Sequence, residues 1–299
     1  PFTTLTIDQG LSDNYVRTLL EHSDGSLWIG SSNGLDRQVG QDIQQIRLAD
    51  GKPVPSVLSL AEAPNGDLWV GTYTVGVMRF RQGQLIAQYQ RKDGLGSNEV
   101  RAILPVNEQD AWFGSSGGVT RLQGETLTNF TTADGLPSSF VSALMQHADG
   151  SIWIGTGKGL AKYAEGKIQF QSLADLDNAQ YIFDFTKVPN SSDFWIATDR
   201  GIIFHQAGGM SLLGRAQGLP FDKVFSMLRQ DNQYFWLSSN RGILRIDQRD
   251  VQAVLPGQAE KLSRFDLFGE PDGMQSAQCN GGSGPAALRD SRGNIWVAT

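Results

Sequence analysis

The chain has 299 residues, of which 39% are hydrophobic, so it can bury a substantial core. Its 35 glycines and 11 prolines stay below the roughly 25–30% at which a non-periodic composition indicates disorder. The net charge of −6 offers a polyanion no attraction, so no nucleic-acid partner is expected. A single cysteine, Cys279, excludes an internal disulfide, and no run reaches the roughly 18 to 20 apolar residues that span a bilayer.

The first elements along the chain are short and of β type. After an extended segment at Phe2–Ile7, four strands are expected, with turns at Asp24-Gly25 and Asn33-Gly34 between the first three. Asp-Gly and Asn-Gly pairs between apolar runs are strong signals of tight hairpin turns. The four expected strands are Val16 to Glu21, Leu27 to Ser31, Leu35 to Val39 and Ile43 to Leu48.

This four-strand unit repeats along the chain, and its tryptophans mark the period. They are separated by 41, 43, 41, 42, 41 and 60 residues, and each lies in similar text such as DGSLWIG, NGDLWVG or DGSIWIG. A period near 42 with short apolar runs leaves no room for long helices, so every unit is predicted to be all β. The tryptophans are Trp28, Trp69, Trp112, Trp153, Trp195, Trp236 and Trp296.

Four antiparallel strands in about 42 residues are typical of a β-propeller blade. Seven tryptophans therefore predict a seven-bladed β-propeller of four-stranded antiparallel blades, formed by residues 1–299 as a single domain. The one long interval is expected to hold an insertion at Gln248 to Lys261. The extended segment at residues 2–7 is expected to close blade seven as its outer strand, and the third strand of that blade is expected beyond Thr299.

The innermost strand of each unit offers a check, because strands that converge on a propeller axis need small side chains. Six of the seven units have a small residue at the same register: Thr18, Ser59, Ala102, Ala143, Ser226 and Ala286. The exception is Asp184, whose carboxylate would lie beside the central channel. Burial without a partner is costly, so Asp184 is expected either to be hydrogen-bonded there or to contact a ligand.

The repeats resemble the two-component regulator propeller repeat, whose pattern is roughly G-L, V-x-x-I, D-x-x-G-x-L-W-I-G-T and G-L-x-R-Y. The segment DGLPSSFVSALMQHADGSIWIGTGKGLAKY (134 to 163) follows this pattern almost residue for residue. The resemblance covers almost the whole chain, although GKPVPSV and ADLDNAQYI depart from the G-L segment in the second and fifth units.

This resemblance implies a periplasmic, ligand-sensing input domain of a bacterial membrane receptor. In the family such a domain is joined to an immunoglobulin-like module, a membrane anchor and then a histidine kinase or a GGDEF diguanylate cyclase. The expected partners are a small-molecule or glycan ligand, that downstream module and a second receptor copy in a homodimer. Neither an enzymatic activity of the propeller nor a cofactor is implied.

Other motifs give no clear chemistry. The run from Gly155 to Gly159 lacks both the spacing and the following helix of a phosphate loop. His22 and His147 occupy the same repeat position beside a turn, and with His205 and one cysteine they form no metal-ligand or triad pattern. Propellers also host lyases, hydrolases and protein-binding modules, so two alternatives stay open: a structural or protein-interaction propeller, and a propeller lyase or hydrolase.

The ligand-binding face is predicted to carry the loops that precede each inner strand and those that join the second and third strands. Variable loops on a rigid scaffold are where recognition concentrates, and aromatic and charged side chains suit a sugar or metabolite. The candidate ligand-binding residues are Tyr15, Tyr73, Glu99, Phe140, Lys158, Tyr181, Asp184, Asp199, Arg200, Lys223 and Arg241. No catalytic or metal-binding residue is predicted.

Overall fold

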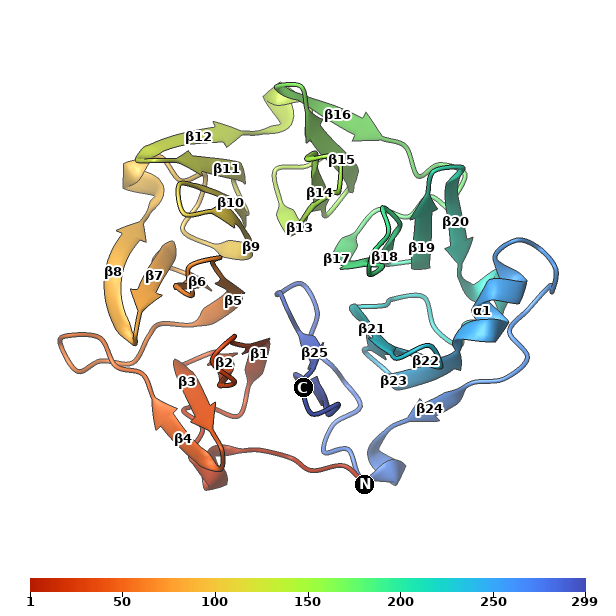
Figure 1. The fold of residues 1–299 in the computed structure, drawn as a ribbon, viewed down its shortest axis with the longest axis horizontal. Coiled ribbons are helices and arrows are strands. Elements are labelled where there is room, and N and C mark those ends of the chain that lie inside the picture. Colours follow the sequence, from red (N-terminus) through yellow and green to blue (C-terminus); the bar gives the residue numbers. More distant parts are fainter.

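The computed structural model describes all residues from Pro1 to Thr299, which form a ring of β-sheets around a central axis (Figure 1). Six of the sheets are four-stranded and antiparallel, and their strands follow one another in chain order from the axis to the rim. Blade one consists of β1 (Val16–Glu21), β2 (Leu27–Ser31), β3 (Gly34–Val39) and β4 (Asp42–Gln45). The four strands predicted from the first repeat are therefore present, although the fourth ends at Gln45 and not at Leu48 as predicted.

The next three blades repeat this arrangement. Blade two consists of β5 (Val57–Glu62), β6 (Leu68–Thr72), β7 (Val77–Arg81) and β8 (Gln84–Tyr89). Blade three consists of β9 (Val100–Asn107), β10 (Asp110–Ser115), β11 (Gly118–Gln123) and β12 (Thr126–Phe130). Blade four consists of β13 (Val141–Gln146), β14 (Ile152–Thr156), β15 (Gly159–Ala164) and β16 (Lys167–Gln171).

Blades five and six complete the set of four-stranded sheets. Blade five consists of β17 (Ile182–Lys187), β18 (Phe194–Thr198), β19 (Gly201–Gln206) and β20 (Gly209–Leu213). Blade six consists of β21 (Ser226–Gln230), β22 (Tyr234–Ser239), β23 (Gly242–Asp247) and β24 (Asp266–Phe268). Short 3-10 helices precede several inner strands, at Ile7–Gln9, Arg91–Asp93, Thr132–Asp134, Arg215–Gln217 and Glu270–Asp272.

The prediction of seven four-stranded blades is wrong, because the structure has six. The seventh repeat forms only a two-stranded sheet of β25 (Ala287–Arg289) and β26 (Ile295–Val297). The expected outer strand at residues 2–7 is also missing: residues 1–6 lie in no strand, although Phe2 packs against Phe268 of β24. The physical reason is that no strand lies between this segment and β26, so the segment has no neighbouring strand to pair with.

The insertion lies where the 60-residue interval predicted it, between β23 and β24. It contains a short helix that the sequence reasoning did not anticipate, α1 (Gln248–Val254), which lies at the rim of the ring (Figure 1). Asp247 caps this helix by accepting a hydrogen bond from the backbone N–H of Arg249. Val251 and Val254 pack into the core shared by blades five and six, so the insertion is an added rim element on one propeller.

The core lies between neighbouring blades. Trp28 and Leu35 of blade one, for example, join Val57, Leu68 and other residues of blade two in one buried cluster. The small residues predicted on the inner strands are all buried, which confirms that register. Close packing also explains the glycine two positions after the tryptophan in blades one to four: a Cβ on Gly30 would lie 2.6 Å from Cγ2 of Thr18. A side chain there would push the first two strands apart.

Candidate functional site at the axial mouth

The beginnings of the inner strands form one face of the ring, which we call the axial mouth. In blade one, Val16 at the start of β1 pairs with Ser31 at the end of β2, so the loops before β1 and after β2 lie at the same end of the blade. A recurring hydrogen bond ties these loops together, as from the N–H of Asp199 to the carbonyl of Tyr181 in blade five. The two predicted loop types therefore do share a face.

A β-bulge near the start of five inner strands adds residues that the sequence reasoning missed. In each case the ladder skips one residue, which is Arg17, Leu58, Arg101, Ser142 or Phe183. Bulges re-aim a side chain and are frequent beside functional sites. The sequence pattern could have identified these bulged residues. Each one directly precedes the small residue of its inner strand, or Asp184 in blade five.

Arg101 joins three of the predicted residues into one cluster. Its guanidinium lies 2.7 Å from a carboxylate oxygen of Glu99 and stands over the ring of Phe140 at 5.2 Å from the centroid. The Phe140 and Tyr181 rings are 6.0 Å apart, and Tyr181 stacks on Phe183 at 4.3 Å. Burial raises the pKa of Tyr181, so its hydroxyl stays protonated and can donate a hydrogen bond.

Arg17 forms a second cluster with two exposed tyrosines. Its guanidinium lies 5.3 Å from the ring centroid of Tyr15 and 6.0 Å from that of Tyr73. These two tyrosines are 53% and 48% exposed, respectively. Arg17 donates to the hydroxyl of Ser56 at 2.6 Å and makes no ion pair, so its positive charge is available to a ligand.

The remaining predicted loop residues are not drawn into either cluster. The side chains of Lys158, Arg200, Lys223 and Arg241 are exposed and make neither a hydrogen bond nor an ion pair. Asp199 instead accepts hydrogen bonds from the N–H groups of Gln180 and Tyr181, at 2.9 and 3.2 Å. Its carboxylate holds the loop that presents Tyr181.

A glycine-rich segment before β25 closes the axis beneath this face. The segment reaches the middle of the ring (Figure 1), where the carbonyl of Gly284 accepts from the N–H of Leu60, and that of Pro285 from the N–H of Leu19. Arg101 donates to the carbonyl of Gly282 at 2.8 Å, which connects the closure to the first cluster. We call residues 281–285 the axial plug.

The channel continues on the other side of the plug as a groove of about 460 Å³. Its walls come from the far ends of the inner strands and include Leu19, Thr186, Met227 and Leu288. Pro285 is part of this lining, so the plug separates the groove from the axial mouth. A ligand at the axial mouth would therefore meet the plug instead of passing through the ring.

Asp184 lies on β17 beside the axis, as its register predicted. The backbone N–H of Phe185 donates to its carboxylate at 2.9 Å, and no cation pairs with it. Burial raises the pKa of Asp184 to about 7. This carboxylate can therefore exchange a proton near neutral pH.

The histidines lie away from the axial mouth, near the turns on the opposite face. His22 contacts the carbonyl of Gly66 at 2.7 Å and His147 that of Ser192 at 2.8 Å, so each links its turn to the next blade. His205 stacks on Phe194 at 4.4 Å. No group of three or more His, Cys, Asp or Glu residues is arranged to hold a metal ion. None of the helices is long and apolar enough to cross a membrane.

The fold and the axial mouth define a β-propeller domain with an aromatic and cationic face. Three of its repeats, residues 10–33, 51–74 and 135–158, match the family described as two component regulator propeller. The chain therefore carries repeats of this family, as its sequence predicted.

Solved structures give the same fold at low sequence identity. One is the extracellular domain of BT3049 of B. thetaiotaomicron, assigned as a hybrid two component system, with 20% identity and a TM-score of 0.76 over 97% of this chain and 38% of that chain. Another is the extracellular domain of BT4673 of the same organism, with 17% identity and a TM-score of 0.72 over 98% of this chain and 40% of that one. The present chain thus spans about two fifths of these domains.

A third structure comes from an enzyme. Virginiamycin B lyase from Staphylococcus aureus is 15% identical, with a TM-score of 0.68 over 96% of this chain and 92% of that chain. At such identities these likenesses define the fold and do not transfer an activity. A search of curated proteins found no significant match.

Proposed function

We propose that the chain is the extracytoplasmic, ligand-sensing input domain of a bacterial membrane signalling receptor, and that the ligand binds at the axial mouth. The family repeats and the likeness to extracellular domains assigned to two component systems support the sensory role. The observation that carries the binding site is the pair of bulged arginines, Arg17 and Arg101, each set against aromatic rings on one face.

The chemistry of this face suits a sugar or another small polar ring. Tyrosine and phenylalanine rings offer flat apolar surfaces, on which the C–H face of a sugar stacks. Glu99 accepts hydrogen bonds from hydroxyl groups, and Arg17 donates to hydroxyl or carboxylate oxygens. A small molecule or glycan fragment that combines a flat face with polar edges fits this arrangement.

The signal requires a ligand that distinguishes two arrangements of the receptor. A ligand shifts such an equilibrium only by as much as its affinity differs between the two states. We therefore propose that the bound propeller favours one arrangement relative to an immunoglobulin-like module, a membrane anchor and a second receptor copy. Output by a histidine kinase or by a GGDEF diguanylate cyclase belongs to the same proposal.

Two alternatives lead to different measurements. A propeller lyase or hydrolase would turn over its ligand; the similar lyase is described as catalytically inactive in a variant that has alanine in place of one histidine. None of His22, His147 and His205 lies at the axial mouth, which favours a binding role there. A structural or protein-interaction propeller would respond to no small ligand at all.

The test is a thermal-shift screen of the 299-residue chain with acidic and neutral oligosaccharides and small carboxylates. A ligand that raises Tm is then measured by calorimetry on the Arg17→Ala and Tyr181→Ala variants, with Arg264→Ala as the matched control on an exposed arginine of the insertion. We expect at least a tenfold loss of affinity in the first two variants, about 1.4 kcal/mol, and none in the control.

Three outcomes would overturn the proposal. The first is that no member of the panel raises Tm. The second is that binding is unaffected in both axial-mouth variants, which would move the site elsewhere. The third is turnover of the ligand, followed by chromatography of the incubated mixture, which would favour the lyase or hydrolase.

A further inference from the structure

Blade five differs from the other five blades in the residue that packs on its tryptophan. In those five, the residue paired with the tryptophan across the second and third strands is a cation, 5.0 to 5.7 Å from the ring centroid. In blade five this position holds Phe204, whose ring centroid lies 4.4 Å from that of Trp195. The five cationic pairs are Trp28 with Arg37, Trp69 with Arg79, Trp112 with Arg121, Trp153 with Lys162 and Trp236 with Arg245.

The aromatic pair of blade five lines a pocket at the rim of the ring, which we call the rim pocket. Its volume of about 350 Å³ lies within the range of roughly 300–1,000 Å³ that is typical of small-molecule sites. The helix α1 lies beside blades five and six (Figure 1) and contributes Val251 and Leu255 to the lining. Phe235 of β22, at 5.2 Å from Trp195, adds a third aromatic ring. These flat apolar surfaces suit an aromatic ligand.

Arg229 on β21 is the one charged residue in the lining of the rim pocket. Its side chain is half-buried, makes no ion pair and donates a single hydrogen bond, to Oδ1 of Asn232 at 3.3 Å. Arginines that pack on the tryptophans of other blades are neutralised within the chain, as Arg79 is by Asp67 at 2.7 Å. Arg229 is therefore free to pair with a carboxylate that a ligand supplies.

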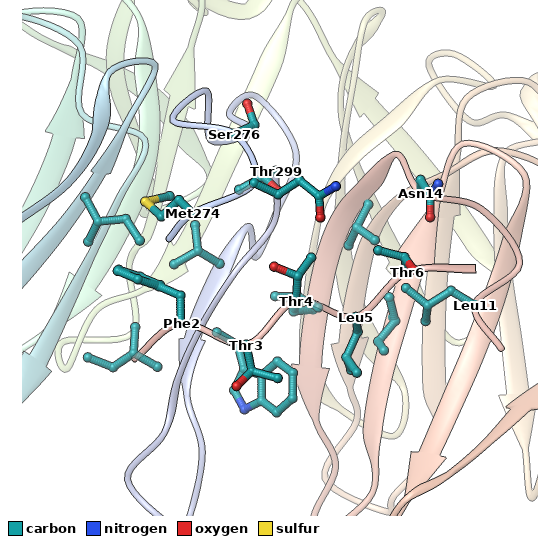
Figure 2. A pocket seen from close by; sticks show the side chains of 18 residues that line it. Phe2, Thr3, Thr4, Leu5, Thr6, Leu11, Asn14, Met274, Ser276 and Thr299 are labelled. Atoms are coloured by element: carbon teal, nitrogen blue, oxygen red, sulfur yellow. The ribbon is translucent and has the colours of Figure 1, made fainter. Parts of the chain in front are cut away.

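A second apolar cavity, of about 310 Å³, lies between the N-terminal segment and β26 (Figure 2). None of the 18 residues that line it has a charged side chain. The two cavities are similar in volume and both are largely apolar, so the arginine is what distinguishes the rim pocket as a site for an anion.

The rim pocket also contains uncharged polar groups that lack partners. Gln248 is buried, and its side-chain amide donates to two backbone carbonyls at 3.2 and 3.1 Å, which leaves its Oε1 without a donor. Gln206, Ser211 and Gln252 line the same pocket and make no side-chain hydrogen bond. These groups can bond to an N–H or hydroxyl group on the ring of a ligand.

We propose that the rim pocket binds a planar aromatic molecule that carries one carboxylate, of the size of an indole or naphthalene carboxylic acid. The ring lies against Trp195 and Phe204 beside α1, and the carboxylate pairs with Arg229. A polar group on the ring bonds to the unpartnered side chains of the lining. This site is separate from the axial mouth, and its occupation does not depend on a ligand there.

The experiment uses indole-3-acetate, its uncharged amide indole-3-acetamide, and acetate. Binding to the 299-residue chain is measured by isothermal titration calorimetry, after circular dichroism has shown that each variant is folded. Arg229→Gln removes the charge, and Gln252→Trp fills the pocket from an exposed position on α1. Arg264→Gln is the matched control, because Arg264 is an exposed arginine of the insertion that does not line the pocket.

Arg229 also lines the groove beyond the axial plug, so two further measurements assign the position of the ligand. Gln252→Trp affects the rim pocket and not that groove. Hydrogen exchange at residues 248–255 reports whether the ligand protects α1.

We expect saturable binding of indole-3-acetate with a dissociation constant below about 1 mM, and no measurable binding of acetate. The amide should bind at least about fivefold more weakly, because it cannot form the ion pair. Arg229→Gln should weaken the acid by the same factor and leave the amide unchanged, so that the preference for the acid disappears. Gln252→Trp should abolish binding of both, and Arg264→Gln should change neither.

Several outcomes would overturn the proposal. They are no saturable binding of the acid up to about 10 mM, equal binding of acid and amide, binding of acetate as tight as that of indole-3-acetate, or an undiminished preference for the acid in Arg229→Gln. Full binding in Gln252→Trp or no protection of residues 248–255 would place the acid elsewhere, and its loss in Arg17→Ala would place it at the axial mouth. None of these results affects the thermal-shift test of the axial mouth, so the two proposals fail independently.

Discussion

Blade four and the β25–β26 sheet contain almost the same second strand in two different surroundings. The strand reads IWIGT in blade four and IWVAT in the seventh repeat. In blade four it lies between two strands and Trp153 is 3% exposed, whereas Trp296 is half-buried beside an open edge. The burial of this tryptophan therefore depends on the third strand and its cation, and not on the sequence of its own strand.

The largest expected effect comes from removing each tryptophan in turn. Trp153→Ala leaves a cavity in a closed core and should lower the free energy of unfolding by about 3–5 kcal/mol. Trp296→Ala removes a side chain that is already partly solvated, so we expect a loss of about 1 kcal/mol. Urea unfolding followed by circular dichroism measures both, and equal losses would show that the two strands have the same surroundings after all.

The next comparison is between two aspartates at equivalent turns, Asp67 of blade two and Asp290 of the seventh repeat, and concerns how much each stabilises the fold. Asp67 is buried between Arg79 and Arg81, so Asp67→Ala leaves two arginines without their partner and should cost about 3 kcal/mol. The equivalent change at Asp290, which is half-buried and has no cation partner, should cost less, about 1 kcal/mol. Chemical denaturation at pH 7 distinguishes the two, and a larger loss at Asp290 would contradict the comparison.

Asp67 also predicts a dependence on acid. Hydrogen bonds from Arg81 and Arg79 lower the pKa of Asp67 from 3.8 to about 2 in the folded chain. The unfolded chain binds the proton first, so the stabilisation is complete above about pH 4 and is lost as the pH falls toward 2. Denaturation midpoints between pH 5 and pH 2 should fall less steeply in Asp67→Ala than in wild type.

The inner strand of blade five allows a comparison with its neighbours, because Asp184 occupies a position where the other repeats have small residues. Burial raises its pKa from 3.8 to about 7, so the folded chain binds a proton that the unfolded chain has already released. Stability should therefore fall as the pH rises from about 4 to 7. Asp184→Asn should be more stable than wild type at pH 8 by about 2 kcal/mol and nearly equal to it at pH 4. A constant difference across this range would contradict the assignment.

The smallest expected effect concerns His205, which packs between blades four and five. Burial is the main cause that lowers its pKa, followed by the charge of His147 and opposed by that of Asp193. The unfolded chain binds this proton more readily, so wild type should lose a few tenths of a kcal/mol between pH 7 and pH 5, an amount kept small because solvent screens the partly buried ring. His205→Phe should reduce that loss, and an unchanged pH profile in thermal unfolding would show that His205 does not contribute.

Much of the scaffold could be predicted from the sequence. The four strands of the first repeat, the small residues on the inner strands and the position of the insertion follow from local patterns. The two loop types were correctly placed on one face, because antiparallel pairing fixes which loops meet. Ligand binding there stays a prediction for Tyr15, Tyr73, Glu99, Phe140, Tyr181 and the other candidates.

The number of complete blades and the composition of the axial mouth were not predicted correctly. Seven tryptophans count repeats, but a blade also needs a third strand, and residues 1–299 form only two strands in the seventh repeat. Arg17 and Arg101 were missed, because a bulge depends on how two strands pair. The axial plug was not predicted, because its backbone bonds to β1 and β5, which lie far from it in the sequence.

The sequence by itself determined the repeat, the approximate positions of most strands and the predominance of β structure, because turns, alternation and small-residue positions act within about 40 residues. Tertiary structure decided which tryptophan is buried, where Arg17 and Arg101 point and what closes the axis. These features depend on contacts between segments that are far apart in the chain, such as Arg101 with Gly282 or Trp296 with Leu5. Such contacts form only when the ring brings distant repeats together, so no local pattern encodes them.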